Sequence, residues 1–203
     1  MRKIATTAFL TAAAAATAIS LSSSPALADP TWTVGPESSG SVDFTADSTT
    51  NLVLTDNNTH TQLTCTTSSG TGDAVYGSGQ SGDDLANVDD LSFGNCSGPA
   101  GITFTVQSSG FAWALNADSY DGVDTTTGSI SGVTAHLSGP LCSADVAGSV
   151  PMTYSNDGTL SATGGSGLTI TNVSGCLGLI KNNDTAGFVG SYAVDPAVTI
   201  TSP

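Results

Sequence analysis

Basic residues are almost absent from this chain. Three lysine and arginine residues stand against 17 acidic ones, which gives a formal net charge of −14 at pH 7. Two of the three, Arg2 and Lys3, lie at the start, so Lys181 is the only cation in the rest of the chain. A protein this acidic repels phosphate backbones and lacks the side chains that would neutralise them. The composition therefore excludes nucleic acid as a partner.

Histidine is also scarce, and this limits the catalytic chemistry that the chain can hold. The two histidines, His60 and His136, are both expected on solvent-facing positions. A serine nucleophile needs such a base within hydrogen-bond reach, and no G-x-S-x-G motif is present. Aspartates are plentiful, but a glycosidase also needs an aromatic-rich cleft, for which two tryptophans and four tyrosines are few. We therefore expect no enzymatic activity and assign no catalytic residue.

The four cysteines lack the C-x-x-C spacing of metal sites. They are Cys65, Cys96, Cys142 and Cys176, an even number, which predicts two disulfide bonds in an exported chain. Three connectivities are possible. We favour Cys65 with Cys96 and Cys142 with Cys176, because each pair closes a local loop, 31 and 34 positions apart.

Residues 1–28 are typical of a secretory signal peptide. Two cations precede an apolar, alanine-rich stretch that ends in Ala26-Leu27-Ala28, an A-x-A cleavage site. We expect cleavage before Asp29 and a single secreted domain over residues 29–203, either free in the extracellular space or associated with the cell surface. This domain carries Lys181 against 17 acidic residues, a formal charge of −16. No membrane anchor is evident in it.

No long stretch of the sequence shows the spacing of apolar residues that is typical of a helix. In the part expected to be secreted, apolar and polar residues alternate as they do in β-strands. In Ile102-Thr-Phe104-Thr-Val106 three apolar side chains share one face. The same alternation surrounds Trp113 and Val133 and recurs over residues 188–194. These patterns predict an all-β domain, an antiparallel sandwich of two sheets, with a closed barrel as the alternative, because strand periodicity does not separate the two. The only helical turn predicted covers residues 83–88.

Two sets of residues are candidates for ligand contact. Three aromatic side chains stand outside the strongly alternating segments and are candidates for exposed binding residues: Trp32, Tyr76 and Tyr120. Three carboxylates cluster around a glycine between two predicted strands, which is a loose match to a calcium loop: Asp118, Asp121 and Asp124. A hairpin loop built from turn-forming Asp and Gly explains the second set better, and calcium binding stays the alternative to be tested.

Several longer runs are specific enough to serve as family markers. They are Phe111-Ala-Trp-Ala-Leu-Asn116, Gly132-Val-Thr-Ala-His-Leu-Ser-Gly-Pro140 and Val173-Ser-Gly-Cys-Leu-Gly-Leu-Ile180. With these runs the chain resembles a family of small secreted actinobacterial proteins of unassigned function, over roughly Leu63 to Pro203. The resemblance implies export from an actinobacterium and supplies neither an activity nor site residues.

The function expected from the sequence is a non-catalytic interaction or structural module, with an extracellular protein or glycan as partner. A module that binds a sugar or another small ligand is one alternative, and it requires a concave pocket with convergent polar groups. A β-barrel channel of the cell envelope is the other, and it requires strands with an apolar outer face. Calcium is the only cofactor considered.

Overall fold

The computed structural model describes residues 31–36 and 39–202, and within them the chain is almost entirely β-structure. The predicted signal peptide and the expected N-terminus at Asp29 lie outside the described residues. The elements are β1 (Trp32–Val34), β2 (Gly40–Ser48), β3 (Leu52–Asp56), β4 (Gln62–Gln80), β5 (Ala86–Ser97), η1 (Pro99–Gly101), β6 (Thr103–Ser109), β7 (Trp113–Tyr120), β8 (Thr125–Gly139), β9 (Cys142–Ser155), β10 (Thr159–Gly175), η2 (Cys176–Gly178), β11 (Thr185–Asp195) and β12 (Ile200–Thr201).

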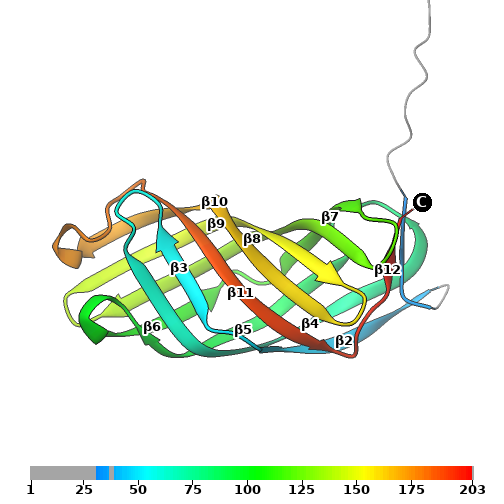
Figure 1. The fold of residues 1–203 in the computed structure, drawn as a ribbon, viewed down its shortest axis with the longest axis horizontal. Coiled ribbons are helices and arrows are strands. Elements are labelled where there is room, and N and C mark those ends of the chain that lie inside the picture. The colour runs from blue at the N-terminus through cyan, green and yellow to red at the C-terminus, as the bar shows by residue number, and fades with distance from the viewer. Residues whose placement is uncertain (1–30, 37–38, 203) are drawn as a thin grey trace, which may run out of the picture.

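The strands close into an eight-stranded antiparallel barrel in which each strand pairs with the next along the chain (Figure 1). β2 and β3 together occupy one strand position of the barrel, since both pair with β4 on one side and β11 on the other. β6 and β7 share a second place, between β5 and β8. The expected sandwich is therefore wrong in its finer detail, and the alternative barrel is the architecture found.

The reason that the sequence favoured the wrong arrangement is physical. The same alternation of apolar and polar residues lines one wall of a sandwich or the inside of a barrel. What distinguishes them is the pairing of β11 with β2 and β3, for example Tyr192 opposite Ser48. Those partners lie more than a hundred positions apart, and local periodicity carries no information about them.

Bulges bend the long strands around the barrel. The register shifts between Thr71 and Gly72 in β4 and between Ile130 and Val133 in β8, and such insertions raise the local twist that closure requires. Gly72 allows one close approach. A Cβ placed on it would lie 2.0 Å from the Asn87 carbonyl oxygen and 2.5 Å from the Phe44 ring. Only a residue without a side chain fits between β5 and that ring.

The interior of the barrel is apolar and its outer surface is rich in hydroxyl groups. Along β9, the inward side chains are buried and apolar: Ala144, Val146, Val150, Met152 and Tyr154. The inward positions predicted from alternation at Phe104, Val106, Trp113 and Leu115 belong to the same core. Ile102 is different: it precedes β6, after η1, and is exposed.

One end of the barrel is covered by the two terminal strands. β1 and β12 pair with each other and lie across this end, which we call the capped end (Figure 1). The Tyr154 hydroxyl donates to the Val198 carbonyl oxygen and accepts from its N–H group, both at 2.8 Å. The amide of Ile200 donates to Asn156 Oδ1. The segment 198–200 is thus tied to the hairpin between β9 and β10.

The opposite end carries both disulfide bonds, and we call it the disulfide end. Cys65 pairs with Cys96 and Cys142 with Cys176, which confirms the predicted connectivity. The helical turn predicted over residues 83–88 is wrong, because β5 begins at Ala86 and the residues before it form bends. Among the described residues no helix is long and apolar enough to cross a membrane.

Candidate ligand-binding cavity

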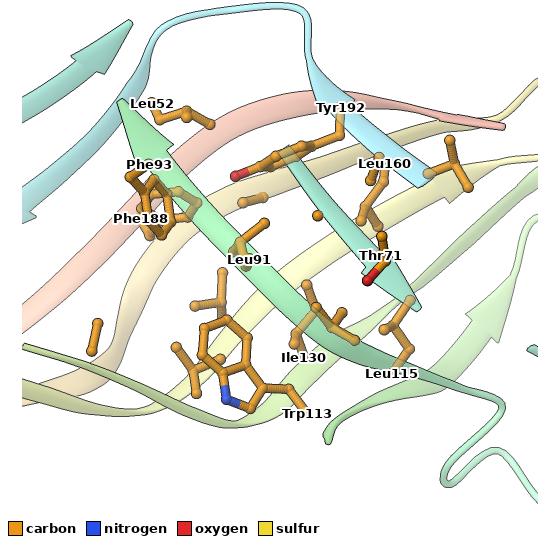
Figure 2. A pocket seen from close by; sticks show the side chains of 18 of the residues that line it. Leu52, Thr71, Leu91, Phe93, Trp113, Leu115, Ile130, Leu160, Phe188 and Tyr192 are labelled. Atoms are coloured by element: carbon orange, nitrogen blue, oxygen red, sulfur yellow. The ribbon is translucent and has the colours of Figure 1, made fainter. Parts of the chain in front are cut away.

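The barrel encloses a cavity of about 130 Å³. Its lining comes from every strand of the barrel and from the segment 198–200 at the capped end. Figure 2 shows Tyr192 and Trp113 on opposite sides of this space, with Phe93 and Phe188 beside it. For comparison, an engineered cavity of about 150 Å³ lined by aliphatic and aromatic side chains stays dry and binds benzene. The cavity is therefore large enough for a small organic molecule.

The cavity exists because many inward positions carry small side chains. Five strands each place one inward alanine in the lining of the cavity: Ala46, Ala74, Ala86, Ala135 and Ala162. Larger inward residues such as Leu91, Phe93 and Ile130 are only partly buried, although they point away from solvent. They contact the barrel wall on one side and empty space on the other. A barrel of eight strands leaves room for one small ligand when its interior is not filled by side chains.

Aromatic rings form much of the wall. Phe93 from β5 and Phe188 from β11 meet edge to face, with ring centroids 6.1 Å apart. Phe111 stacks on Trp113 with a centroid distance of 4.9 Å. The indole N–H of Trp113 donates to the Ser109 carbonyl oxygen at 2.9 Å. A ligand in the cavity would therefore contact the carbon atoms of the Trp113 ring and not its N–H group.

Both phenol hydroxyls of the lining are already paired within the protein. Tyr154 is bound to Val198 at the capped end, and the Tyr192 hydroxyl donates to Ser68 Oγ at 3.2 Å. Thr71 adds one hydroxyl at the bulge of β4. No residue of the lining is charged at neutral pH. A ligand in this space would gain from apolar contact and would find few hydrogen-bond partners.

No family model, curated protein or solved structure matches this chain. The function therefore has to be argued from the cavity and from the surfaces around it. Within the described residues, the remaining candidates are the residues singled out by the sequence, the ionisable groups on the strands, and a second, smaller cavity.

Tyr192 gives a direct test of how dry the cavity wall is. Burial, only partly offset by the hydrogen bond to Ser68, raises the pKa of Tyr192 to about 12. In the unfolded chain the phenol ionises near pH 10, so between about pH 10 and 12 the unfolded state loses a proton that the folded state keeps. Stability therefore falls as the pH rises through this window.

We expect Tyr192→Phe to remove this contribution, so that the variant loses less stability between pH 9 and pH 11 than the natural protein does. Denaturant unfolding at the two pH values measures the difference. An equal loss in both proteins would show that the Tyr192 phenol ionises as readily in the fold as in the unfolded chain.

The three aromatic residues that the sequence marked for ligand contact do not line the cavity. Trp32 is 1% exposed and belongs to the core of the capped end, so it is not the exposed aromatic that was expected. Tyr76 is half-buried, with its ring packed over Gly35. Tyr120 is also half-buried, and its hydroxyl donates to the Val123 carbonyl oxygen at 2.7 Å. Each has a structural partner within the fold.

The predicted calcium loop is a hydrogen-bonded turn at the capped end. Asp121 Oδ1 accepts the backbone N–H groups of Val123, Asp124 and Thr125 at 2.8 to 3.0 Å. These bonds, the one from Thr125 foremost, hold the pKa of Asp121 below its usual value. Over residues 31–36 and 39–202, no group of three or more potential ligands is placed to hold a metal, so Asp118 is not brought together with Asp121 and Asp124 for that purpose.

His136 lies in a polar network on the outer face of the barrel. Its Nδ1 is 2.6 Å from Asp145 Oδ1, and the Asn172 amide donates to Asp145 Oδ2 at 2.7 Å. These two hydrogen bonds, that with His136 first, lower the pKa of Asp145. Both side chains of the ion pair are exposed, and the described hydrogen bonds connect no hydroxyl or thiol to His136. His60 is exposed in the turn after β3, as expected.

A second cavity of about 40 Å³ lies at the disulfide end. Leu54, Leu63 and Leu137 line both cavities, so they form the boundary between them. Asp56 also lines the smaller one and is 2% exposed. Its Oδ1 accepts the N–H groups of Asn58 and Thr59, while Oδ2 has no partner among the described residues. The carboxylate thereby fixes the turn that connects β3 to β4.

The residues that surround the main cavity were assigned to the core by the sequence pattern or not singled out at all. The same apolar side chains would fill the core of a β-sandwich as well as they line the inside of a barrel. The one signal in the sequence is the frequency of alanine and glycine at inward positions, such as Phe188-x-Gly190-x-Tyr192. That signal indicates free space only once the closure of the barrel is known.

Proposed function

We propose that this protein binds a small, uncharged, apolar molecule inside the barrel. The observation that carries the proposal is the cavity of about 130 Å³, with aromatic and aliphatic walls and no charged residue in its lining. Sites for small molecules are concave, mostly apolar and largely pre-formed. The protein would act as an extracellular carrier or scavenger, in keeping with its two disulfide bonds.

A binding role is favoured over catalysis by the chemistry of the lining. The only titratable side chains that it contains are the phenols of Tyr154 and Tyr192, and burial raises the pKa of both. Neither can serve as a base near neutral pH. Sugar is a poorer ligand than an apolar molecule, because it needs hydrogen-bond partners and both phenols are already engaged.

The outer surface favours a water-soluble carrier over a channel. Among the large apolar side chains that are exposed, only Val75 and Val189 lie on the strands of the barrel; the others are in the connections or next to them. A membrane-spanning barrel carries a continuous apolar band on its outer face. Two isolated valines do not form one, and the interaction module first expected remains a role that the outer surface could serve in addition.

The proposal is tested by filling the cavity. Ala135 points into it from β8, whereas Ala147 on β9, which pairs with the preceding residue Thr134, is exposed on the outer face. We expect the protein to bind toluene, used as the apolar probe, with a negative heat-capacity change in calorimetry. Ala135→Phe places a ring in the cavity and should weaken binding by about tenfold or more, equivalent to about 1.4 kcal/mol. The matched variant Ala147→Phe should bind as the natural protein does.

A second variant covers the case in which Ala135→Phe does not fold. Leu91→Ala enlarges the cavity from the side of β5 and should improve binding of a larger probe such as naphthalene relative to toluene. Circular dichroism confirms the fold of each variant. The proposal fails if the natural protein takes up neither probe, or if Ala135→Phe and Ala147→Phe weaken binding equally.

A further inference from the structure

The disulfide end of the barrel carries exposed leucines that are not part of the hydrophobic core. Leu177 is 85% exposed and Leu141 is 76% exposed, and Leu179 and Ile102 are also exposed at this end. Leu141 and Leu177 flank the bond between Cys142 and Cys176, and the Cys176 N–H donates to the Leu141 carbonyl oxygen. We call these four side chains the apolar tips. Single exposed leucines are ordinary, but neighbouring ones on connected loops mark an interaction site.

The apolar tips are held in place. The hydroxyl groups of Thr59 and Thr61 both donate to the Leu179 carbonyl oxygen, at 2.6 and 2.8 Å. The Leu179 N–H donates to the Cys176 carbonyl oxygen. Leu177 has a φ of +50°, a conformation that a leucine rarely adopts without compensation. The fold therefore presents Leu177 to solvent in a fixed position.

Charge is distributed unequally between the two ends. The loops of the capped end carry six exposed aspartates: Asp83, Asp84, Asp121, Asp124, Asp157 and Asp195. The loops of the disulfide end carry Lys181, the only cation of the described chain, and the two carboxylates in or beside them are both buried: Asp56, at the end of β3, and Asp184, which accepts the Lys181 N–H. The molecule is thus acidic at one end and apolar at the other.

We propose that the disulfide end docks on an uncharged lipid surface, with the apolar tips inserted among the lipid chains. The four apolar tips lie on three connections, those between β5 and β6, β8 and β9, and β10 and β11, at the left end of the barrel in Figure 1. Separate apolar side chains of this kind suit a fluid surface that fills the space between them. The acidic end then faces water, which places most of the negative charge away from the lipid. Insertion of a few apolar side chains gives reversible attachment and not an anchor.

The second cavity lies between this surface and the main cavity. Leu179, one of the apolar tips, lines it together with Ile180, and Leu54, Leu63 and Leu137 separate it from the main cavity. The docking proposal itself depends on the exposed loops alone and holds whether or not the main cavity is occupied.

Vesicle flotation tests the docking. We expect the purified protein to float with phosphatidylcholine vesicles, and the variant with both Leu141→Asp and Leu177→Asp to lose binding by about tenfold or more, because two apolar contacts are removed. Val123 is the matched control: it is 78% exposed, but in a loop of the capped end. Val123→Asp should float as the natural protein does. Replacing a third of the lipid by phosphatidylglycerol should weaken binding at low salt, since the protein is acidic.

Three results overturn the proposal. The first is a natural protein that stays in the lipid-free fraction. The second is equal loss of binding in Val123→Asp and in the double variant, which would make added charge the cause. The third is a dimer in sedimentation velocity that the double variant dissociates while vesicles bind neither protein. In that case the apolar tips contact a second copy of this chain and not lipid.

Discussion

Replacing Trp32 with alanine is expected to lower the free energy of unfolding by about 3 to 5 kcal/mol, the range for truncating a buried aromatic side chain. Trp32 is the largest of the fully buried side chains, and it stands on a strand of only three residues. Few hydrogen bonds hold that strand and β12 to the barrel. Burial of Trp32 therefore adds to the hydrogen bonds of Val198 and Ile200 in keeping the capped end closed.

The loss should be local before it is global. Hydrogen exchange of the Ile200 amide, which donates to Asn156 Oδ1, should accelerate in Trp32→Ala more than exchange of amides in β9. Trp32→Phe keeps an aromatic ring in the same place and should lose less stability. If Trp32→Ala unfolds at the same guanidinium concentration as the natural protein, the terminal strands do not cover the barrel in solution.

Trp32 also illustrates where sequence reasoning reaches its limit. Its neighbours do not alternate over a long stretch, so the sequence placed it among exposed aromatics, and yet its burial needs only three residues of strand. Trp32 pairs with Gln80 of β4, far along the chain, and its indole nitrogen lies beside Gly82. A short strand buried by a distant one leaves no periodic pattern to detect.

Local features were predicted far better. The disulfide pairing followed from loop length alone, and the structure places Cys65 opposite Cys96 on adjacent strands. The alternating segment around Phe104 and Val106 became β6 with those residues inward. In each case the partners lie on consecutive strands, so short-range information was sufficient.

The cavity depends on information of a different kind. Whether the space beside Ala135 and Ala162 is filled depends on which strands face one another across the barrel, and that depends on the closure between β11 and the pair β2 and β3. A sandwich with the same sequence would bring other side chains against these alanines. The candidate site thus appears only at the level of the closed barrel.

Removing the bond between Cys142 and Cys176 by a double substitution to alanine is expected to cost roughly 3 to 4 kcal/mol of stability, the chain-entropy value for a loop of this length. The two residues are 34 positions apart, and the bond joins the start of β9 to the end of β10 at the disulfide end. The double variant of Cys65 and Cys96, 31 positions apart, should lose a similar amount. Guanidinium unfolding under oxidising conditions measures both.

Alanine is the right replacement because three of the four cysteines are buried: Cys65, Cys96 and Cys176. A serine there would bury a hydroxyl group and add a cost unrelated to the bond. A loss below about 1 kcal/mol, far under the chain-entropy value, would show that the bond does not constrain the unfolded chain.

The two bonds differ in what else they support. Cys142 and Cys176 hold the loops of Leu141 and Leu177, whereas Cys65 and Cys96 lie within paired strands. If the apolar tips dock on lipid, the Cys142 and Cys176 variant should lose vesicle binding below its unfolding temperature, because the loops no longer present both leucines together. The Cys65 and Cys96 variant should lose stability alone. Equal vesicle binding by both variants would separate the docking of the apolar tips from the disulfide that flanks them.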